Sequence, residues 1–547
     1  MNYFFTNFSK IAFMLKTGVK TKLKQIFGIR DFKYIFKLTL PIFIQTLFFA
    51  LVSVVGSLAT TMYYKVWHID GSYNGYYFYT FAKILTVYKI LTFIPLIYQL
   101  GVLVLASNLF GQKKEKDIPK VLWSSIYVSL LINFGCYLIM FFSAPAILSA
   151  SGAKASPIIA WKTQEGYQLY MNNVERLKAA NISAADITQA IYGGSYQGII
   201  LENTKPLILE TSELAFTVKF IRLTTLDIFL ASIALIFVSA LQAIEKNNYA
   251  IIGIISSIFI RTAFTYSVLF IPNGRLNLIL LISMETVVGA LINLVISYAF
   301  VYHFIFKKYK IKVSETWNNR YIREVIKLGL PIALETGIWF IAQYMIASAI
   351  PYGNLDAKYV GLWRAVNNTY DIFNSFVMAL SYVTTVIVGI EIGKQDFKRA
   401  HSLGNSSLKL GFYAQTILSI CGLLLTWPSL KIYSIDTAMI NQVGYFVVGL
   451  MMLKAIFDIG NLTTLRALWG ANDVWMPNFV ALLTMIGVQL SAVYMVAIFQ
   501  NTAEFKLSQG IYIILLTAAT LLDPIFRTIL FGLRWNSYKW TKYAKKL

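Results

Sequence analysis

The sequence is poor in the residues that build metal sites and disulfide frameworks. Its 547 residues include only two cysteines and three histidines. Cys136 and Cys421 both lie in apolar runs, where a small apolar side chain is the expected role rather than a disulfide partner. His68, His303 and His401 are scattered in or near loops. These scarcities exclude a histidine-rich metal centre and a catalytic triad, and we expect no cofactor.

Charged residues are also scarce, and no nucleotide-binding loop ending in Gly-Lys-Ser or Gly-Lys-Thr is present, which excludes a built-in ATPase. Only 13% of residues are charged and 57% are hydrophobic, and the mean hydropathy is +0.62. Apolar runs of about 20 residues, long enough to cross a bilayer, recur along the chain. The composition therefore predicts an all-α, multi-pass membrane protein rather than a soluble enzyme.

The formal net charge of +23 is concentrated in alternate loops, which indicates orientation in a membrane rather than binding of nucleic acid. The basic segments are the lysine-rich, amphipathic residues 1–34, the loop containing Lys113 and Lys116, the linker 307–321, the loop containing Lys394, and the tail 535–547. The loops between them are short and nearly neutral. We therefore expect a cell-membrane protein with both termini in the cytoplasm and an even number of spans.

The apolar runs predict about twelve spans, six in each half of the chain. They fall near residues 35–62, 80–110, 121–150, 213–243, 249–271, 277–306, 322–350, 358–391, 404–430, 440–469, 474–499 and 509–534. We expect a first six-helix bundle over 35–306 and a second over 322–534. A polar insertion, residues 151–210, lies between the third and fourth spans on the non-cytoplasmic side, where we expect a small cap or a partly ordered loop.

The two halves repeat each other. Lys37-Leu-Thr-Leu-Pro41 opens the first span and Lys327-Leu-Gly-Leu-Pro331 opens the seventh, while Gly111 and Gly393 each precede a basic loop. Halves of six spans each run in the same direction, so a twofold axis along the membrane normal is expected to relate them, with the substrate path between.

With these motifs in place, the chain resembles the multidrug and toxic compound extrusion (MATE) family. The resemblance also depends on Leu465-Arg-Ala-Leu-Trp-Gly-Ala-Asn-Asp473, which is similar to a signature of that family. It implies two six-helix bundles that alternate access and export organic, often cationic, compounds in exchange for H⁺ or Na⁺. The chain departs from many bacterial members because its first span carries no acid, and Gln45 is the most polar residue there.

Carboxylates at membrane depth are costly, so they are the candidate coupling residues. Glu335 lies about 18 Å into the seventh span at 1.5 Å per residue, near the midplane, and its counterpart in the repeat is Gln45. Asp458 lies on the tenth span four residues after Lys454, so a local ion pair is the alternative to an ion-binding role. We expect Glu335, Asp371 and Asp458 to carry H⁺ or, as an alternative, to bind Na⁺.

The eighth span carries a polar stripe at three- and four-residue steps, which predicts the wall of a substrate cavity. Its members are Arg364, Asn367, Asn368, Asp371, Asn374, Ser375 and Met378. The repeat places Lys89 opposite Asp371, and we expect the two to pair in one access state. Asp227 is a further cavity candidate. Arg222 and Glu285 of the first half are further candidates, and Arg261 is expected to neutralise an acid among them. Asp523 is either a cap at the kink of Pro524 or functional.

The sequence thus predicts a secondary-active exporter of organic cations, expected to act as a monomer, with H⁺ or Na⁺ as the exchanged ion. A flippase for a lipid-linked or polysaccharide precursor is the alternative within the same superfamily. A membrane enzyme is disfavoured because no catalytic cluster can be built, and a channel because a twofold repeat lacks a filter segment.

Overall fold

The structure is a computed structural model. It describes residues 31–66, 93–150, 158–160, 172, 195–196, 199–200, 207–210, 212–269, 278–352, 357–433, 435–501 and 507–544. Within this part, twelve helices are long and apolar enough to cross a membrane. The prediction of an all-α, twelve-span protein is confirmed for the membrane region.

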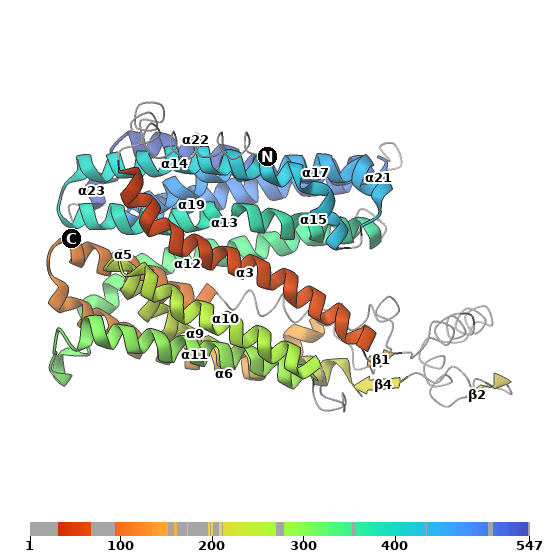
Figure 1. The fold of residues 1–547 in the computed structure, drawn as a ribbon, viewed down its shortest axis with the longest axis horizontal. Coiled ribbons are helices and arrows are strands. Elements are labelled where there is room, and N and C mark those ends of the chain that lie inside the picture. Colours follow the sequence, from red (N-terminus) through yellow and green to blue (C-terminus); the bar gives the residue numbers. More distant parts are fainter. Residues whose placement is uncertain are drawn as a thin grey trace, which may run out of the picture.

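The first half contributes six helices. They are α3 (Phe32–Val66), α5 (Phe93–Gly111), α6 (Ile118–Ala150), α9 (Glu213–Ala243), α10 (Asn247–Leu269) and α11 (Leu278–Val301), which the π-helical turn η3 (Tyr302–Phe306) extends. Short 3₁₀ turns, η1 (Glu115–Asp117) and η4 (Val313–Glu315), lie in the basic loops. Helices α5, α6, α9, α10 and α11 gather on one side of the molecule (Figure 1).

The second half repeats this arrangement with more interruptions. Its first spans are α12 (Asn319–Tyr352), α13 (Ala357–Gly393) and α14 (Phe397–Leu424), the last followed by α15 (Thr426–Ile432). The tenth span comprises α16 (Thr437–Met439), η5 (Ile440–Gly444), α17 (Tyr445–Asp458), η6 (Ile459–Thr463) and α18 (Thr464–Gly470). The last two comprise α19 (Trp475–Thr484), η7 (Met485–Leu490) and α20 (Ser491–Asn501), then α21 (Gln509–Ala519) and α22 (Leu522–Asn536), and α23 (Thr541–Ala544) follows.

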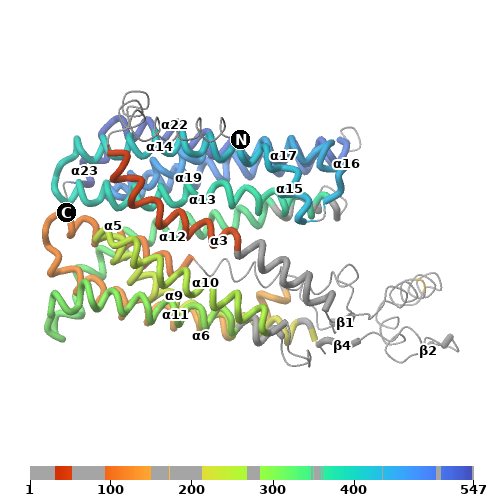
Figure 2. Tube along the Cα trace, viewed as in Figure 1, coloured from red at the N-terminus to blue at the C-terminus, as the bar shows by residue number. Residues whose placement is uncertain are grey.

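The described part of the insertion contains strands, which the sequence did not predict. Strand β1 (Ile158–Ala160) pairs antiparallel with β4 (Leu207–Glu210), and β2 (Ser195–Tyr196) pairs with β3 (Ile199–Ile200). In Figure 1 these strands lie beyond one end of the bundles, and Figure 2 traces the two groups of helices in the same view. The β1–β4 pair joins the two ends of the insertion beside the ends of α6 and α9.

Two repeat-related helices lie at the centre of the molecule. In the apolar stretches of α5 and α13 that cross the membrane, 83% of residues are buried. In that of α6 only 28% are buried, and the helix exposes Leu131 and Phe142. Helix α5 packs against α12 and α13, and α3 crosses between α13 and α10 (Figure 1). Large apolar side chains on the outer helices are the surface expected to face lipid.

The repeat extends to backbone geometry. After Gly111 and Gly393 the chain turns in the same way, because Lys113 and Gln395 both adopt a left-handed conformation with φ near 60°. The amides of these two residues donate back to the end of the preceding helix in the same way: Lys113 N bonds Phe110 O, and Gln395 N bonds Ile392 O. We call the end of the molecule that carries these loops, the linker 307–318 and α23 the basic end.

The two halves meet most closely at the basic end, through glycines. A Cβ on Gly111 would collide with the carbonyl oxygen of Ile390, and a Cβ on Gly393 would collide with that of Asn108. One helix pair away, Gly101 and Gly329 make the same kind of contact, with the carbonyls of Val325 and Ile97. In each pair the touched carbonyl lies three or four residues before the partner glycine. Gly111 and Gly393 are counterparts in the repeat, so their contact is twofold symmetric, whereas Gly101 and Gly329 lie on the second and seventh spans and are not counterparts. We call these four glycines the glycine seal.

Candidate functional site

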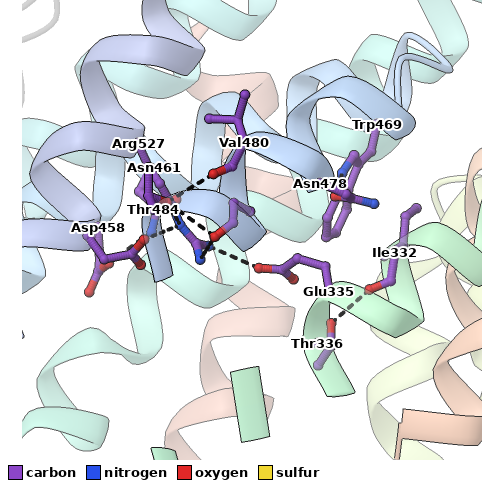
Figure 3. Close-up of polar contacts among 12 residues, drawn as sticks. Ile332, Glu335, Thr336, Asp458, Asn461, Trp469, Asn478, Val480, Thr484 and Arg527 are labelled. Atoms are coloured by element: carbon purple, nitrogen blue, oxygen red, sulfur yellow. Dashed lines mark hydrogen bonds and ion pairs between the residues drawn. The ribbon is translucent and has the colours of Figure 1, made fainter. Parts of the chain in front are cut away.

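A buried arginine on the last span organises the charged interior of the second half. Arg527 of α22 donates from Nη1 to Glu335 Oε1 of α12 at 3.0 Å and from Nε to Asp523 Oδ1 at 2.7 Å. The three side chains are 2%, 9% and 7% exposed. Figure 3 shows Glu335 reaching from its helix toward the guanidinium. Glu335 thus lies in the interior of the second bundle, where it is an ion-pair partner rather than an isolated carboxyl.

The other donors of this guanidinium bind the eleventh span. Nε also bonds Thr484 Oγ1 at 3.2 Å, and Nη2 donates to the carbonyl of Ala481 at 2.9 Å. One side chain therefore joins three spans. The network contains two carboxyl groups and one guanidinium, so full ionisation would leave one net negative charge in a buried position, which is costly unless a proton or cation neutralises it.

A second network surrounds Asp458 at the end of α17. Its Oδ2 accepts from the Tyr370 hydroxyl and from Lys454 Nζ, the latter at 3.3 Å, and its Oδ1 accepts from Asn461 Nδ2 at 3.3 Å. Asn374 Nδ2 donates to the Tyr370 oxygen at 3.0 Å. The predicted Lys454–Asp458 pair is present, and it is charge-balanced.

Both networks are placed by π-helical segments. Asp458 is the last residue before η6, and Thr484 is the last before η7. Such segments disturb the regular hydrogen bonding of a helix and frequently mark functional sites. Helix α22 packs directly on η6, because Thr528 Oγ1 donates to the carbonyl of Phe457 at 2.8 Å and a Cβ on Gly460 would collide with Thr528. Since Arg527 precedes Thr528, the two networks lie next to each other.

The polar stripe of α13 separates into two groups. Arg364 and Asp371 are exposed and Asn367, Asn368 and Met378 are half-buried, whereas Asn374 is buried in the Asp458 network. Asn367 Nδ2 donates to the carbonyl of Trp363 at 2.8 Å within the same helix. Beyond Met378 the helix is buried nearly all round. The stripe is therefore accessible only in the part of α13 far from the basic end.

The first half holds fewer charges near the interface. Gln45 is half-buried and its Oε1 has no hydrogen-bond partner, while the neighbouring Thr46 hydroxyl donates to the Ser375 carbonyl of α13 at 2.9 Å. Asp227 of α9 is buried. Arg261 bonds Glu285 at 3.2 Å, as the sequence suggested it would neutralise an acid. Lys89 lies outside the described residues, so its pairing with Asp371 stays a prediction.

Arg222 is the other arginine among the described residues of the first half, and its side chain contacts a carbonyl and a ring. Arg222 donates from Nε and Nη2 to the Phe141 carbonyl, at 3.1 and 2.9 Å, and lies over the Phe141 ring. It therefore joins the third and fourth spans.

The predicted sodium ligands are not gathered into one site. Among the described residues no three acids, histidines or cysteines form a group that could hold a metal ion. Glu335 is bonded to Arg527 and Asp458 to Lys454, so each buried carboxylate already faces a basic side chain. Sequence reasoning missed Arg527 altogether. Its four-residue spacing from Asp523 on one helix was the available signal, the same signal that indicated Lys454 and Asp458.

Comparison with known proteins agrees with this architecture. The family model MatE matches residues 331–495, and the model described as polysaccharide biosynthesis protein matches residues 198–389. An uncharacterized transporter of Bacillus subtilis, YisQ, is 24% identical over 262 residues, which are 47% of this chain and 54% of that protein. The aligned region thus spans about half of that relative.

Solved structures match over nearly the whole chain. An outward-facing multidrug resistance MATE transporter of the MOP superfamily superposes with a TM-score of 0.68 at 11% identity, covering 94% of this chain and 96% of the other. A MOP superfamily transporter from Pyrococcus furiosus, described with a reverse polarity of its binding pocket, gives 0.65 at 10% identity, covering 94% and 99%. The chain is a multi-pass membrane protein with the fold of MOP superfamily transporters. The MATE resemblance drawn from its sequence is confirmed, and these relatives are described as transporters.

Proposed function

We propose that this protein is a secondary-active exporter that exchanges an organic substrate for protons by alternating access. The observation that carries the proposal is the buried network in which Arg527 lies between Glu335 and Asp523. When both carboxyl groups are ionised, they carry one negative charge more than the single guanidinium neutralises. A proton that binds and leaves this network is the simplest coupling event, because it changes the buried charge between zero and minus one.

A proton fits this network better than Na⁺. Alkali and alkaline-earth cations are held by several oxygen ligands with no competing cation among them. Here the Arg527 guanidinium contacts both carboxylates, so it takes the place that a bound cation would require. Lys454 does the same at Asp458. We therefore assign proton coupling to the Glu335 network and treat Asp458 as its neighbour in the same bundle.

The glycine seal supports alternating access. The halves touch backbone to backbone at the basic end, while the stripe of α13 is exposed toward the opposite end. A rocking motion that separates Gly111 from Ile390 and Gly393 from Asn108 would reverse this accessibility. If the basic loops face the cytoplasm, as proposed, this structure is the state that is closed on the cytoplasmic side of the cell membrane.

Organic cations are the proposed substrates because Asp371 is the exposed carboxylate of the α13 stripe. A flippase for a lipid-linked or polysaccharide precursor is the second candidate, and the match of residues 198–389 to a polysaccharide biosynthesis model favours it. The two differ in the charge that the interface must accept.

The test is transport into proteoliposomes that contain the purified full-length protein, with a fluorescent organic cation and either a proton or a sodium gradient. We expect the proton gradient alone to drive transport, and we expect Glu335→Gln to abolish that drive. Asp371→Asn is expected to raise the cation concentration that gives half-maximal transport, without removing proton coupling. Transport driven by sodium and unaffected by Glu335→Gln would contradict the proposal.

A further inference from the structure

Arg466 of α18 is a buried cation with two guanidinium nitrogens that have no acceptor. Its side chain belongs to a residue only 7% exposed, yet neither Nε nor Nη1 has a hydrogen-bond partner. Other buried or half-buried arginines have one: Arg527 binds Glu335, Arg534 binds Asp473 and Arg222 binds the Phe141 carbonyl. A buried guanidinium with unsatisfied donors is costly, and buried charges of this kind in membrane proteins usually mark functional sites.

The surroundings of Arg466 hold its guanidinium between two aromatic rings. The guanidinium carbon lies 4.3 Å from the centre of the Tyr382 ring and 4.5 Å from that of Trp469. Trp469 is fixed in turn, because its Nε1 donates to Asn478 Oδ1 at 3.0 Å. The Thr385 hydroxyl donates to the Arg466 carbonyl at 3.1 Å, which fixes the backbone. Stacking on rings stabilises the charge but leaves the in-plane donors free for a ligand.

Tyr382 connects this arginine to the accessible stripe of α13. It follows Arg364 by eighteen residues, which is about five turns at 3.6 residues per turn, so both lie on one face of the helix. Asp371 and Met378 lie between them on that face, and exposure falls from Arg364 and Asp371 to the half-buried Met378 and Tyr382.

About two turns beyond Tyr382 on the same face lies the closed end of the interface. Gly389 there contacts Ser107 of α5 and the carbonyl of Gly470 of α18. Tyr382, with Arg466 behind it, is therefore placed at the inner end of the stripe, directly before the contact that closes the two halves at the basic end.

We propose that Arg466 is an anion-binding subsite at the inner end of the transport path, and that it takes an oxyanion of the substrate, a phosphate or a carboxylate. This inference rests on the proposed transport by alternating access, not on the proposed organic-cation substrate, and it names a chemical group that the substrate carries. Movement of the Tyr382 ring would uncover the free Nε and Nη1 donors to that group. A charged phosphate or carboxylate makes the strong, charge-assisted hydrogen bonds that these donors lack. A substrate of this kind is what the second candidate function would require.

The first experiment measures thermal unfolding of the purified full-length protein in detergent, with pyrophosphate, citrate or chloride at equal ionic strength. We expect pyrophosphate or citrate, but not chloride, to raise the Tm by about 3 °C or more at saturation. The anion that gives the larger shift distinguishes a phosphate-bearing from a carboxylate-bearing substrate. Arg466→Gln should remove the shift, Arg466→Lys should reduce it, and Arg320→Gln at the exposed basic end should retain it.

The sign of the change without anion separates a ligand site from a structural role. Arg466→Gln removes an unpaired buried charge, so its Tm without anion is expected to equal or exceed that of the wild type. A fall in Tm by several degrees, together with an unchanged pyrophosphate or citrate shift, would show that Arg466 is structural and would overturn the proposal.

A second measurement needs no variant. Phenylglyoxal modification of Arg466 in the wild-type protein, followed by peptide mass spectrometry, should slow several-fold when the anion that raises the Tm is present, whereas modification of Arg320 should not. Equal modification of Arg466 with and without that anion would contradict the inference. Neither measurement uses an ion gradient, so failure of proton-driven transport and failure of this subsite are separate outcomes.

Discussion

Glu335 and Asp523 bind the same guanidinium, that of Arg527, although Glu335 lies on the seventh span and Asp523 on the twelfth. Arg527 is therefore the cation that offsets the negative charge of both buried carboxyl groups. Removing one partner of a buried ion pair typically costs about 3–5 kcal/mol, because the remaining charge is left uncompensated.

We therefore predict that Arg527→Gln is strongly destabilising, by about 3–5 kcal/mol. The variant leaves Glu335 and Asp523 without the cation that both contact, and it also leaves the Ala481 carbonyl without its donor. Thermal unfolding in detergent at neutral pH measures the effect. The matched control is Arg320→Gln, which changes an exposed arginine and should leave the Tm nearly unchanged. Similar Tm values for the two variants would show that the network is not structural.

The double variant Arg527→Gln with Glu335→Gln sharpens this test. The second substitution removes one of the two carboxylates that Arg527→Gln leaves without a cation. The double variant should therefore lose less unfolding free energy than the sum of the losses of the two single variants. Additive effects would mean that the two side chains do not interact, since coupled neighbours depart from additivity.

Much of the framework could be predicted from the sequence because it depends on local patterns. Apolar length predicted twelve spans, and repetition at Pro41 and Pro331 and at Gly111 and Gly393 predicted the duplicated bundle, which the matching turns at Lys113 and Gln395 bear out. The expected depth of Glu335 used only its distance along a helix. Each of these inferences needs only one stretch of chain.

The partners of Glu335 could not be predicted in this way. Arg527 lies 192 residues away in the chain, and which helices meet in a bundle depends on packing that one sequence does not reveal. The same holds for Tyr370. Its position on the helix does not indicate a polar partner, yet its hydroxyl donates to Asp458. The strands of the insertion were missed because they are two to four residues long, too short for a periodic pattern.

Asp523→Asn is predicted to separate stability from coupling. The asparagine Oδ1 can still accept from Arg527 Nε, and the network then contains one carboxylate and one guanidinium, which are balanced. We expect a Tm within about 3 °C of the wild type, or higher, together with transport whose rate no longer changes with the proton gradient. Transport assays in proteoliposomes at several values of internal and external pH provide the measurement. Retained gradient dependence would remove this network from the coupling mechanism.

Tyr370→Phe is predicted to weaken the second network by about 1–3 kcal/mol, the usual cost of leaving buried polar groups unpaired. The change deletes only a hydroxyl, which donates to Asp458 and accepts from Asn374 and Lys454, the latter at 2.9 Å. The control is Tyr445→Phe, because that ring is 42% exposed. Thermal unfolding distinguishes them, and an equal Tm for both variants would count against a network at Asp458.

The glycine seal makes a prediction about conformation rather than stability alone. Alanine at Gly111 or Gly393 adds a methyl group where the other half's backbone lies, and such overpacking typically costs about 1–3 kcal/mol. That cost applies only to the state in which the halves touch at the basic end. We therefore expect Gly111→Ala and Gly393→Ala to shift the population toward a state with separated basic ends.

Spin labels at Lys113 and Lys394, two exposed positions after the sealed helix ends, report this separation. In a background without Cys136 and Cys421, pulsed electron paramagnetic resonance should show the short distance of the sealed state in the parent and a longer population in each alanine variant. Gly135→Ala is the matched control, because a Cβ at Gly135 meets nothing within 4 Å. Identical distance distributions in all three variants would show that these glycines merely pack, and that the basic end opens by another contact. A longer population that appears in both seal variants but not in Gly135→Ala would identify Gly111 and Gly393 as the contact that the transport cycle must break.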